Sequence, residues 1–210
     1  MSEDIQRESG GKKQEIVQAA HDLFVKQGYH GTSMRQIARS AEIALGGLYY
    51  HFNSKEQVFK EVFLRYHPYH DVMPVLISAE GETVEQVVGN AIKQMIQALG
   101  DRPDFMNLMF IEVVEFNSEH VGELASSLRP YQLEIVERIV QLDRDRLRPI
   151  PPLMLIRTFF GLFFSYLITE IVLAKQAPEE MRENALEYFI DIYLHGILRD
   201  NAGTQGIAQV

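Results

Sequence analysis

Hydrophobic residues recur at helical spacing along almost the whole chain. Between Lys13 and Gln27 the apolar positions are one, three or four residues apart and end at Gly28, which is typical of an amphipathic helix closed by glycine. No alternating pattern typical of β-strands competes with this spacing. The sequence therefore predicts an all-α fold, with a short helix beginning at Met34 and further helices over about 44–51, 55–66, 83–99, 104–117, 119–145, 152–175 and 178–198.

The segment 33–55 predicts two short helices joined by a tight turn. Ser33 and Gln36 form a capping box, so the first of these helices begins at Met34. In the second, Leu48 and Phe52 are four residues apart and point together into a core. The neighbouring aromatic and imidazole side chains at 49–51 are then left largely outside it, which favours contact with an external partner.

A second capping box, Ser54 with Gln57, opens the helix over 55–66, and Pro68 ends it. The chain thus divides into a predicted disordered arm (1–11), a three-helix helix-turn-helix domain (12–54), a larger helical domain (55–200) and a tail (201–210). The helix 55–66 would connect the two domains.

Charge is distributed unevenly along the chain. The net charge of −9 by itself disfavours a nucleic-acid binder. Residues 12–66, however, carry eight Lys/Arg against five Asp/Glu, whereas residues 67–210 carry eleven against twenty-one. A mildly basic N-terminal part followed by an acidic remainder suits a protein that contacts phosphate through its N-terminal part only. The chain has no cysteine, which excludes disulfides and thiolate chemistry and fits a cytoplasmic location.

The most hydrophobic stretch lies between residues 153 and 174. Its uninterrupted apolar part, Phe159 to Ile168, covers about 10 residues, whereas a membrane span needs about 20, so we expect no membrane segment. A helix that is apolar on almost every side in a soluble protein is buried centrally or between subunits. We therefore expect a homodimer through the helices at about 152–175 and 178–198.

The chain resembles transcription regulators of the TetR family. The resemblance rests on the helix and turn over 16–29 and on the segments 32–38 (TSMRQIA), 46–52 (GGLYYHF) and 54–56 (SKE). It implies a homodimer that binds double-stranded operator DNA with a palindromic sequence. It further implies repression that is relieved when a small molecule enters the C-terminal domain.

Matching positions imply which residues contact DNA. Arg35 is the expected base reader, because its guanidinium matches guanine O6 and N7. Tyr49 and Lys55 match phosphate-contacting positions, and Tyr50 and His51 match groove-facing ones. The full predicted set is Ser33, Arg35, Gly46, Gly47, Tyr49, Tyr50, His51 and Lys55.

The chain departs from the family pattern around the turn between these helices. Glu42 stands where the family usually has glycine, and Ala44 replaces a Ser or Thr cap. Gly46 and Gly47 each cost about 1 kcal/mol of helix stability relative to alanine. One interpretation is that the helix orders fully on DNA, with the glycines allowing close approach to a phosphate. The other is weak operator binding, as in a helical dimeric interaction module with degenerate DNA binding.

A ligand pocket is expected in the larger domain, for an apolar or amphipathic small-molecule effector. Glu112 interrupts a largely apolar helix and would favour a cationic ligand if it faced the cavity. The candidate pocket residues are Phe63, Tyr66, Met106, Met109, Phe110, Glu112, Phe160 and Phe164.

Other classes of function find little support. The residues His67 to Asp71 include His-x-x-His, but no further ligand is identifiable, and an ordinary loop is the favoured interpretation over a metal site. No nucleophile–base pair or phosphate loop stands out, so we expect no enzyme and no cofactor.

Overall fold

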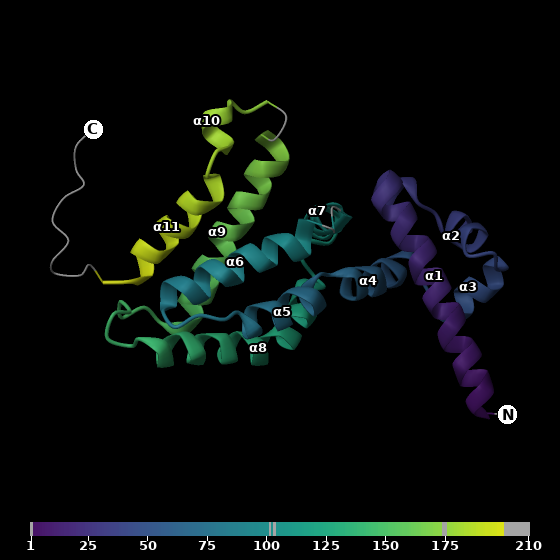
Figure 1. Ribbon diagram of the computed structural model, residues 1–210. Helices are drawn as coiled ribbons and strands as arrows, with labels where there is room; N and C mark the ends of the chain where they lie inside the picture. Colours follow the sequence, from purple (N-terminus) through teal and green to yellow (C-terminus); the bar gives the residue numbers. More distant parts are fainter. Residues whose placement is uncertain (1, 101, 103, 174–175, 200–210) are drawn as a thin grey trace. The chain divides into compact units, whose positions relative to one another are not determined.

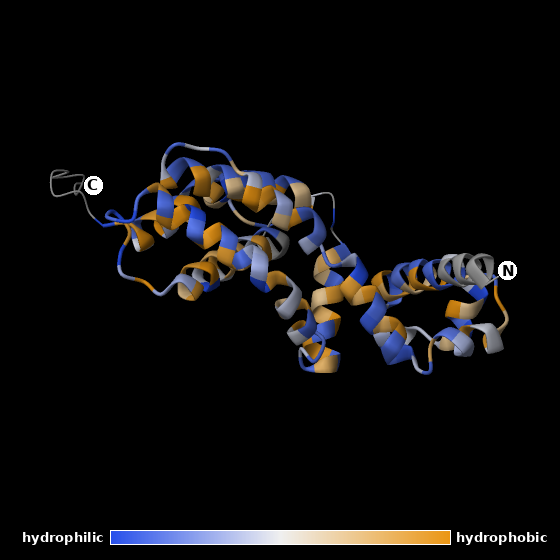
Figure 2. Cartoon of the chain, turned by 90° about the horizontal axis from the view of Figure 1, so that it is seen from below, coloured by the Kyte–Doolittle hydropathy of each residue, from blue (hydrophilic) through white to orange (hydrophobic). Residues whose placement is uncertain are grey.

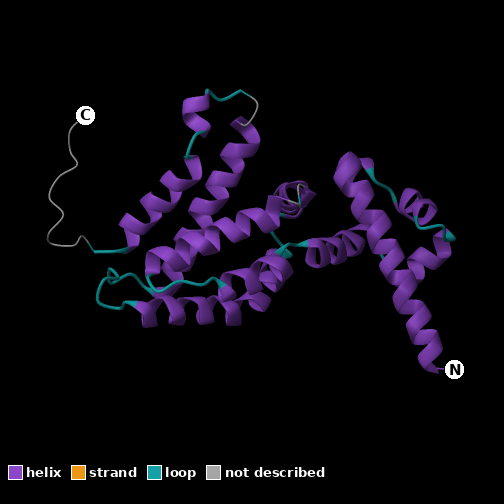
Figure 3. Cartoon of the chain, in the orientation of Figure 1, coloured by secondary structure: helices purple, strands orange, loops and turns teal. Residues whose placement is uncertain are grey.

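The computed structural model describes residues 2–100, 102, 104–173 and 176–199, and these are mostly helical (Figures 1 and 3). Within them no β-strand occurs beyond one isolated bridge between Leu147 and Leu198, which confirms the all-α prediction. The predicted tail, 201–210, lies outside these ranges. The helices are α1 (Ser2–Gly31), α2 (Met34–Ser40), α3 (Leu45–His51), α4 (Lys55–Tyr66), α5 (Tyr69–Ser78), α6 (Val84–Gly100), α7 (Asp104–Phe116), α8 (Val121–Leu142), α9 (Pro152–Leu173), α10 (Glu179–Arg182) and α11 (Ala185–Ile197).

The chain forms two compact units. Unit 1 contains the described residues up to His70 together with Leu99–Ser127, and unit 2 contains Asp71–Ala98 and the described residues from Leu128 onward. Unit 1 thus joins α1–α4 with α7, and unit 2 contains most of α5, α6 and α8 with α9–α11. Polar and hydrophobic residues alternate along the helices of both units, as expected of amphipathic helices (Figure 2).

Helix α1 extends back to Ser2, whereas the sequence predicts a disordered arm over 1–11. Once the packed part of a helix has formed, each further residue adds a hydrogen bond without a new nucleation cost, so a polar segment continues it. The predicted break at Gly28 is present: this residue has φ 74° and ψ 176°, a conformation outside the helical region. The chain then turns towards α2.

An aromatic cluster holds unit 1 together. The Phe59 ring of α4 lies 5.4 Å from that of Phe24 in α1 and 4.8 Å from that of Phe116 in α7. Stacked and edge-to-face pairs at these distances are favourable beyond the area they bury. The connecting helix α4 is therefore fixed to α1 and α7. Its buried residues are Val58, Phe59, Val62 and Phe63.

Helix α5 was not predicted from the sequence, and the segment 67–71, expected as a loop, includes its first turn. Pro68 and Pro74 read as helix breakers, but proline is tolerated at the beginning of a helix. Pro74 lies inside α5 at the cost of a backbone hydrogen bond. Burial of Val72, Met73 and Leu76 on one face outweighs this cost.

In unit 2, helix α9 packs against α11. The predicted helix over 178–198 is two helices, because Asn184 adopts a left-handed conformation (φ 55°) between α10 and α11. Leu147 pairs with Leu198 just beyond the end of α11. Pro152–Glu170 is long and apolar enough to cross a membrane by length and composition, and 11% of that stretch is buried within one chain. One helix of this kind is weak evidence for a membrane span, so the expectation of no membrane segment stays a prediction.

Candidate nucleic-acid interface and ligand cavity

The helix-turn-helix begins with the predicted capping box. The Gln36 backbone N–H donates to Ser33 Oγ at 3.3 Å, and the Ser33 N–H donates to Gln36 Oε1 at 2.8 Å. The Ser33 hydroxyl also donates to Gln36 Oε1. These bonds start α2 at Met34, as predicted, and leave Arg35 exposed in its first turn.

The turn after α2 is a Schellman motif with Glu42 in the position where glycine is usual. The Ile43 N–H donates to the Ala38 carbonyl at 3.0 Å, and the Glu42 N–H donates to the Arg39 carbonyl at 3.2 Å. Glu42 has φ 53°, in the left-handed region that costs an L-residue roughly 1–2 kcal/mol. The turn therefore stores local strain beside the second helix.

Helix α3 presents two tyrosines to solvent. Leu48 is fully buried and Phe52 nearly so, and they anchor this helix to the core as predicted. Tyr49 is 47% exposed and Tyr50 82% exposed, with the His51 ring 5.2 Å from that of Tyr50. Tyr50 is mostly exposed to solvent, and a tyrosine hydroxyl in this position can hydrogen-bond to a phosphate oxygen.

The N-terminus of α3 lacks a side-chain cap, because Ala44 has no oxygen to offer. The positions of the Cβ atoms that Gly46 and Gly47 lack are open space, and both residues are exposed. Neither glycine is therefore required by packing within the chain. Glycine at these two positions would instead allow the backbone of an external partner to come close to α3.

Lys55 lies in a different environment from the one its predicted role suggests. Its ammonium group donates to the backbone carbonyls of Tyr29 at 2.7 Å and Thr32 at 2.8 Å, and lies 4.0 Å from the centre of the Tyr29 ring. Burial lowers the pKa of Lys55, opposed by the charge of Glu115. Two of its three protons thus fasten α4 to the end of α1, leaving one for a phosphate.

Glu112 is a core residue of unit 1 and not a cavity carboxylate. It is fully buried and accepts hydrogen bonds from the backbone N–H of His120 at 2.7 Å and from the His120 ring at 2.8 Å. A buried carboxylate needs such partners to offset its lost hydration. The interpretation of Glu112 as a selector of cationic ligands is therefore corrected.

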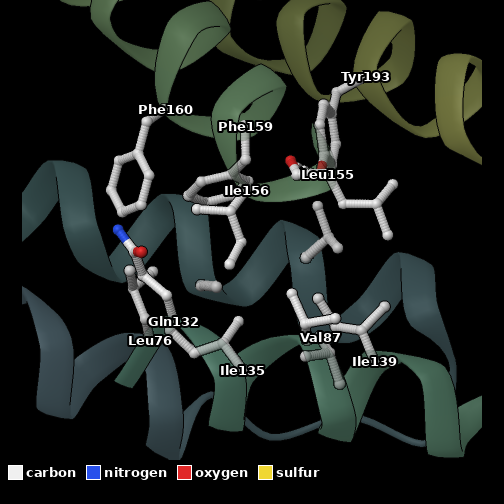
Figure 4. Close-up of a pocket in the computed structure, with 13 residues that line it drawn as sticks. Leu76, Val87, Gln132, Ile135, Ile139, Leu155, Ile156, Phe159, Phe160 and Tyr193 are labelled. Atoms are coloured by element: carbon white, nitrogen blue, oxygen red, sulfur yellow. Dashed lines mark hydrogen bonds between the residues drawn. The ribbon is translucent and has the colours of Figure 1, made fainter. Parts of the chain in front are cut away.

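Unit 2 contains a cavity between α5, α6, α8, α9 and α11 (Figure 4). The empty space between these helices, counted together with the solvent at its opening, is about 500 Å³. Its described lining consists of Leu76, Val87, Val88, Ala91, Gln132, Ile135, Val136, Ile139, Leu155, Ile156, Phe159, Phe160 and Tyr193.

Phe160 is the predicted pocket residue that lines this cavity. Phe63 and Met106 belong to the core of unit 1, and the Tyr66 ring stacks on His21. Met109, Phe110 and Phe164 do not line the cavity either, and the last two are exposed. The prediction missed most of the lining, although Gln132 leaves a signal in the sequence: a polar residue on the apolar stripe of Ile135, Val136 and Ile139.

The described residues contain no group of three or more His, Asp or Glu side chains arranged to hold a metal ion. His67 accepts a hydrogen bond from the Tyr69 backbone N–H at 3.3 Å, and its ring packs against Phe63 and Phe105. Burial, with the charges of His70 and Arg102, lowers the pKa of His67 to about 4. This imidazole is part of the packing between α4, α5 and α7.

The helices that build the exposed α3 face also match a known family. The sequence profile described as "Bacterial regulatory proteins, tetR family" matches residues 16–62, from the packed part of α1 through most of α4. Residues 16–62 belong to the TetR family. Proteins of this family are transcription regulators that bind operator DNA and small-molecule effectors and act as dimers.

Individual TetR-family relatives agree with this assignment. The uncharacterised regulator YfiR of Bacillus subtilis is 24% identical over 165 residues, which cover 76% of this chain and 80% of that protein. The repressor KstR2 of Mycolicibacterium smegmatis is 40% identical over 62 residues, 30% of each chain. The crystal structure of Bacillus subtilis FadR in complex with stearoyl-CoA shares the fold, with a TM-score of 0.66 at 17% identity over 88% of this chain and 98% of FadR.

Proposed function

We propose that this protein is a cytoplasmic, ligand-responsive transcription repressor that binds a palindromic operator as a dimer. The observation that carries the proposal is the α3 face, where buried Leu48 holds the exposed Tyr49 and Tyr50 outward. In a dimer two such helices enter successive turns of the major groove. The proposed DNA-contacting residues are Ser33, Arg35, Gly46, Gly47, Tyr49, Tyr50, His51 and Lys55.

The proposed response to ligand uses the cavity of unit 2. A ligand releases the operator only if it binds better to the conformation in which the two recognition helices are wrongly spaced. The chemistry of an apolar cavity suits an apolar or amphipathic effector, and the FadR relative was solved with an acyl-CoA. The proposed dimer forms through α9 and α11, whose exposed apolar residues are Leu153, Met154, Phe164, Tyr188 and Ile192.

A helical interaction module that has lost operator binding is the second candidate. The uncapped start of α3, its two glycines and the engagement of Lys55 favour it. Salt dependence separates the two candidates, because each phosphate contact releases counterions and lowers the logarithm of affinity linearly with the logarithm of salt.

The test is fluorescence anisotropy with a labelled mixed-sequence duplex between 50 and 200 mM salt. With one Arg35 contact from each protomer, the repressor loses affinity by at least about tenfold over this range. Arg35→Ala weakens binding and flattens the slope, whereas Arg129→Ala, which removes an exposed arginine of α8, changes neither. Absence of binding at 50 mM salt favours the interaction module.

A further inference from the structure

The cavity of unit 2 has a nearly uniform hydrocarbon wall. None of the described residues that line it carries a charge, and only Gln132 and Tyr193 bring polar side-chain atoms. An ion moved into such surroundings loses hydration that the wall does not replace. The chemistry of the wall therefore selects against a buried charged group of either sign.

Neither Arg138 nor the Tyr193 hydroxyl alters this selection. Arg138, on the same helix as Gln132, donates to the carbonyls of Ile77 and Ala79 at the end of α5. The Tyr193 hydroxyl donates to the Leu155 carbonyl at 3.0 Å, and burial raises the pKa of Tyr193 to about 12. Tyr193 stays neutral at physiological pH with its proton engaged, so it offers a ligand no strong donor.

Gln132 differs from Arg138 and Tyr193 in its hydrogen bonding. Its amide has no hydrogen-bond partner among the described residues, and the close-up shows its nitrogen and oxygen directed towards Phe160 at one end of the cavity (Figure 4). Ile139 and Val87 lie towards the other end. An amide both donates and accepts, so it matches a hydroxyl, carbonyl or amide group on a ligand.

We propose that this cavity binds an uncharged, mainly hydrocarbon molecule with one hydrogen-bonding group, which meets the Gln132 amide while the hydrocarbon lies towards Val87 and Ile139. This proposal names the chemical class of the effector, and it rests on the proposed function, because only in a ligand-responsive repressor does binding in this cavity regulate transcription. A small apolar pocket with one placed polar group fixes the orientation of its ligand as well as its class.

The test uses three probes of equal chain length: decanol, decanoate and decylammonium. Calorimetric titration of the full-length protein without DNA measures binding alone, so failure of operator recognition leaves the result unaffected. Decanol binds at least roughly tenfold more tightly than either ion, because the ions lose hydration in the cavity. Gln132→Leu weakens decanol binding several-fold, whereas Gln141→Leu, at an exposed position of the same helix, does not.

A charge introduced at the same position tests the geometry again. Gln132→Glu makes decylammonium the preferred probe over decanoate, because the new carboxylate meets the head group in the cavity. Circular dichroism of each variant checks that the helices are intact. Three results each overturn the inference: an ion that binds the wild-type protein as tightly as decanol, no binding of decanol, or Gln132→Leu and Gln132→Glu proteins that bind all three probes with wild-type affinities.

Discussion

Glu42 ends helix α2 in a conformation that glycine adopts at lower cost. Its backbone hydrogen bonds complete the Schellman motif, so the left-handed φ of 53° is imposed by the turn rather than by the side chain. The exposed carboxylate adds a negative charge near the face proposed to meet DNA. The strain lowers the stability of the turn, and the charge opposes tight binding of the proposed operator.

Replacing Glu42 separates these two effects. Glu42→Gly relieves the left-handed strain at some cost in backbone entropy, for a net gain of about 0.5–1 kcal/mol in the free energy of unfolding. Glu42→Ala keeps the strain but removes the charge, so it gains no stability. Both variants bind DNA more tightly than wild type at low salt. Urea denaturation and anisotropy measure the two quantities, and equal stability of the Gly and Ala variants contradicts the account.

Lys55 fastens the first turn of α4 to the end of α1 through two carbonyls. Lys55→Met keeps the aliphatic stem and removes both hydrogen bonds, so we expect the free energy of unfolding to fall by about 2 kcal/mol. Lys26→Met, at an exposed position of α1, is the matched control and changes stability little. Unchanged urea denaturation of Lys55→Met would mean that these bonds do not fasten the helices.

At the scale of elements, the junction of α4 and α5 depends on a neutral imidazole. His67 accepts the Tyr69 N–H through Nδ1, which needs an unprotonated nitrogen, and its ring packs against Phe63 and Phe105. Burial lowers its pKa from 6.5 to about 4. Protonation therefore opposes the native packing of this junction.

The sign of the resulting pH dependence follows from the direction of that shift. Between pH 6.5 and 4 the unfolded chain takes up a proton that the folded chain does not, so stability is lost as pH falls through this window, by up to about 3 kcal/mol. His67→Gln removes this contribution and makes the stability curve flatter than that of wild type. Identical curves for wild type and His67→Gln refute the assignment.

A helix could be predicted from the sequence where the interactions that stabilise it involve neighbouring residues. Helices α2 and α4 carry their start signals in neighbouring residues, Ser33 and Ser54, so their first residues were predicted correctly. Helix α5 was missed because packing outweighs its proline. The helix-turn-helix is formed by neighbouring residues, so its helices could be predicted from local sequence. The cavity is lined by side chains from helices far apart in sequence, and of the predicted pocket residues Phe160 lines it.

The exposed apolar residues of α9 and α11 form the surface through which we propose that two copies of the chain associate. Tyr188 and Ile192 are more than 60% exposed and lie four residues apart on α11. Exposed apolar patches of this kind mark interfaces, and homodimers most often form through one self-complementary patch. In the proposed dimer, burial between subunits would also account for the apolar sequence of α9.

A charge in that patch prevents dimerisation. Ile192→Arg gives a particle of the chain mass, 24.1 kDa, in light scattering, whereas wild type gives twice that mass. Val114→Arg adds the same charge at an exposed apolar position of α7 and leaves the dimer intact. A dimeric Ile192→Arg protein would place the interface elsewhere.

Operator recognition through α2 and α3 is tested by selection of the purified protein against a random-sequence duplex library at low salt, beside the Arg35→Ala, Tyr50→Ala double variant. We expect enrichment of a palindrome whose half-sites lie about one helical turn apart or somewhat more, and its loss in the double variant. Failure of wild type to enrich any sequence, or the same palindrome enriched by the double variant, would contradict recognition of an operator through α2 and α3.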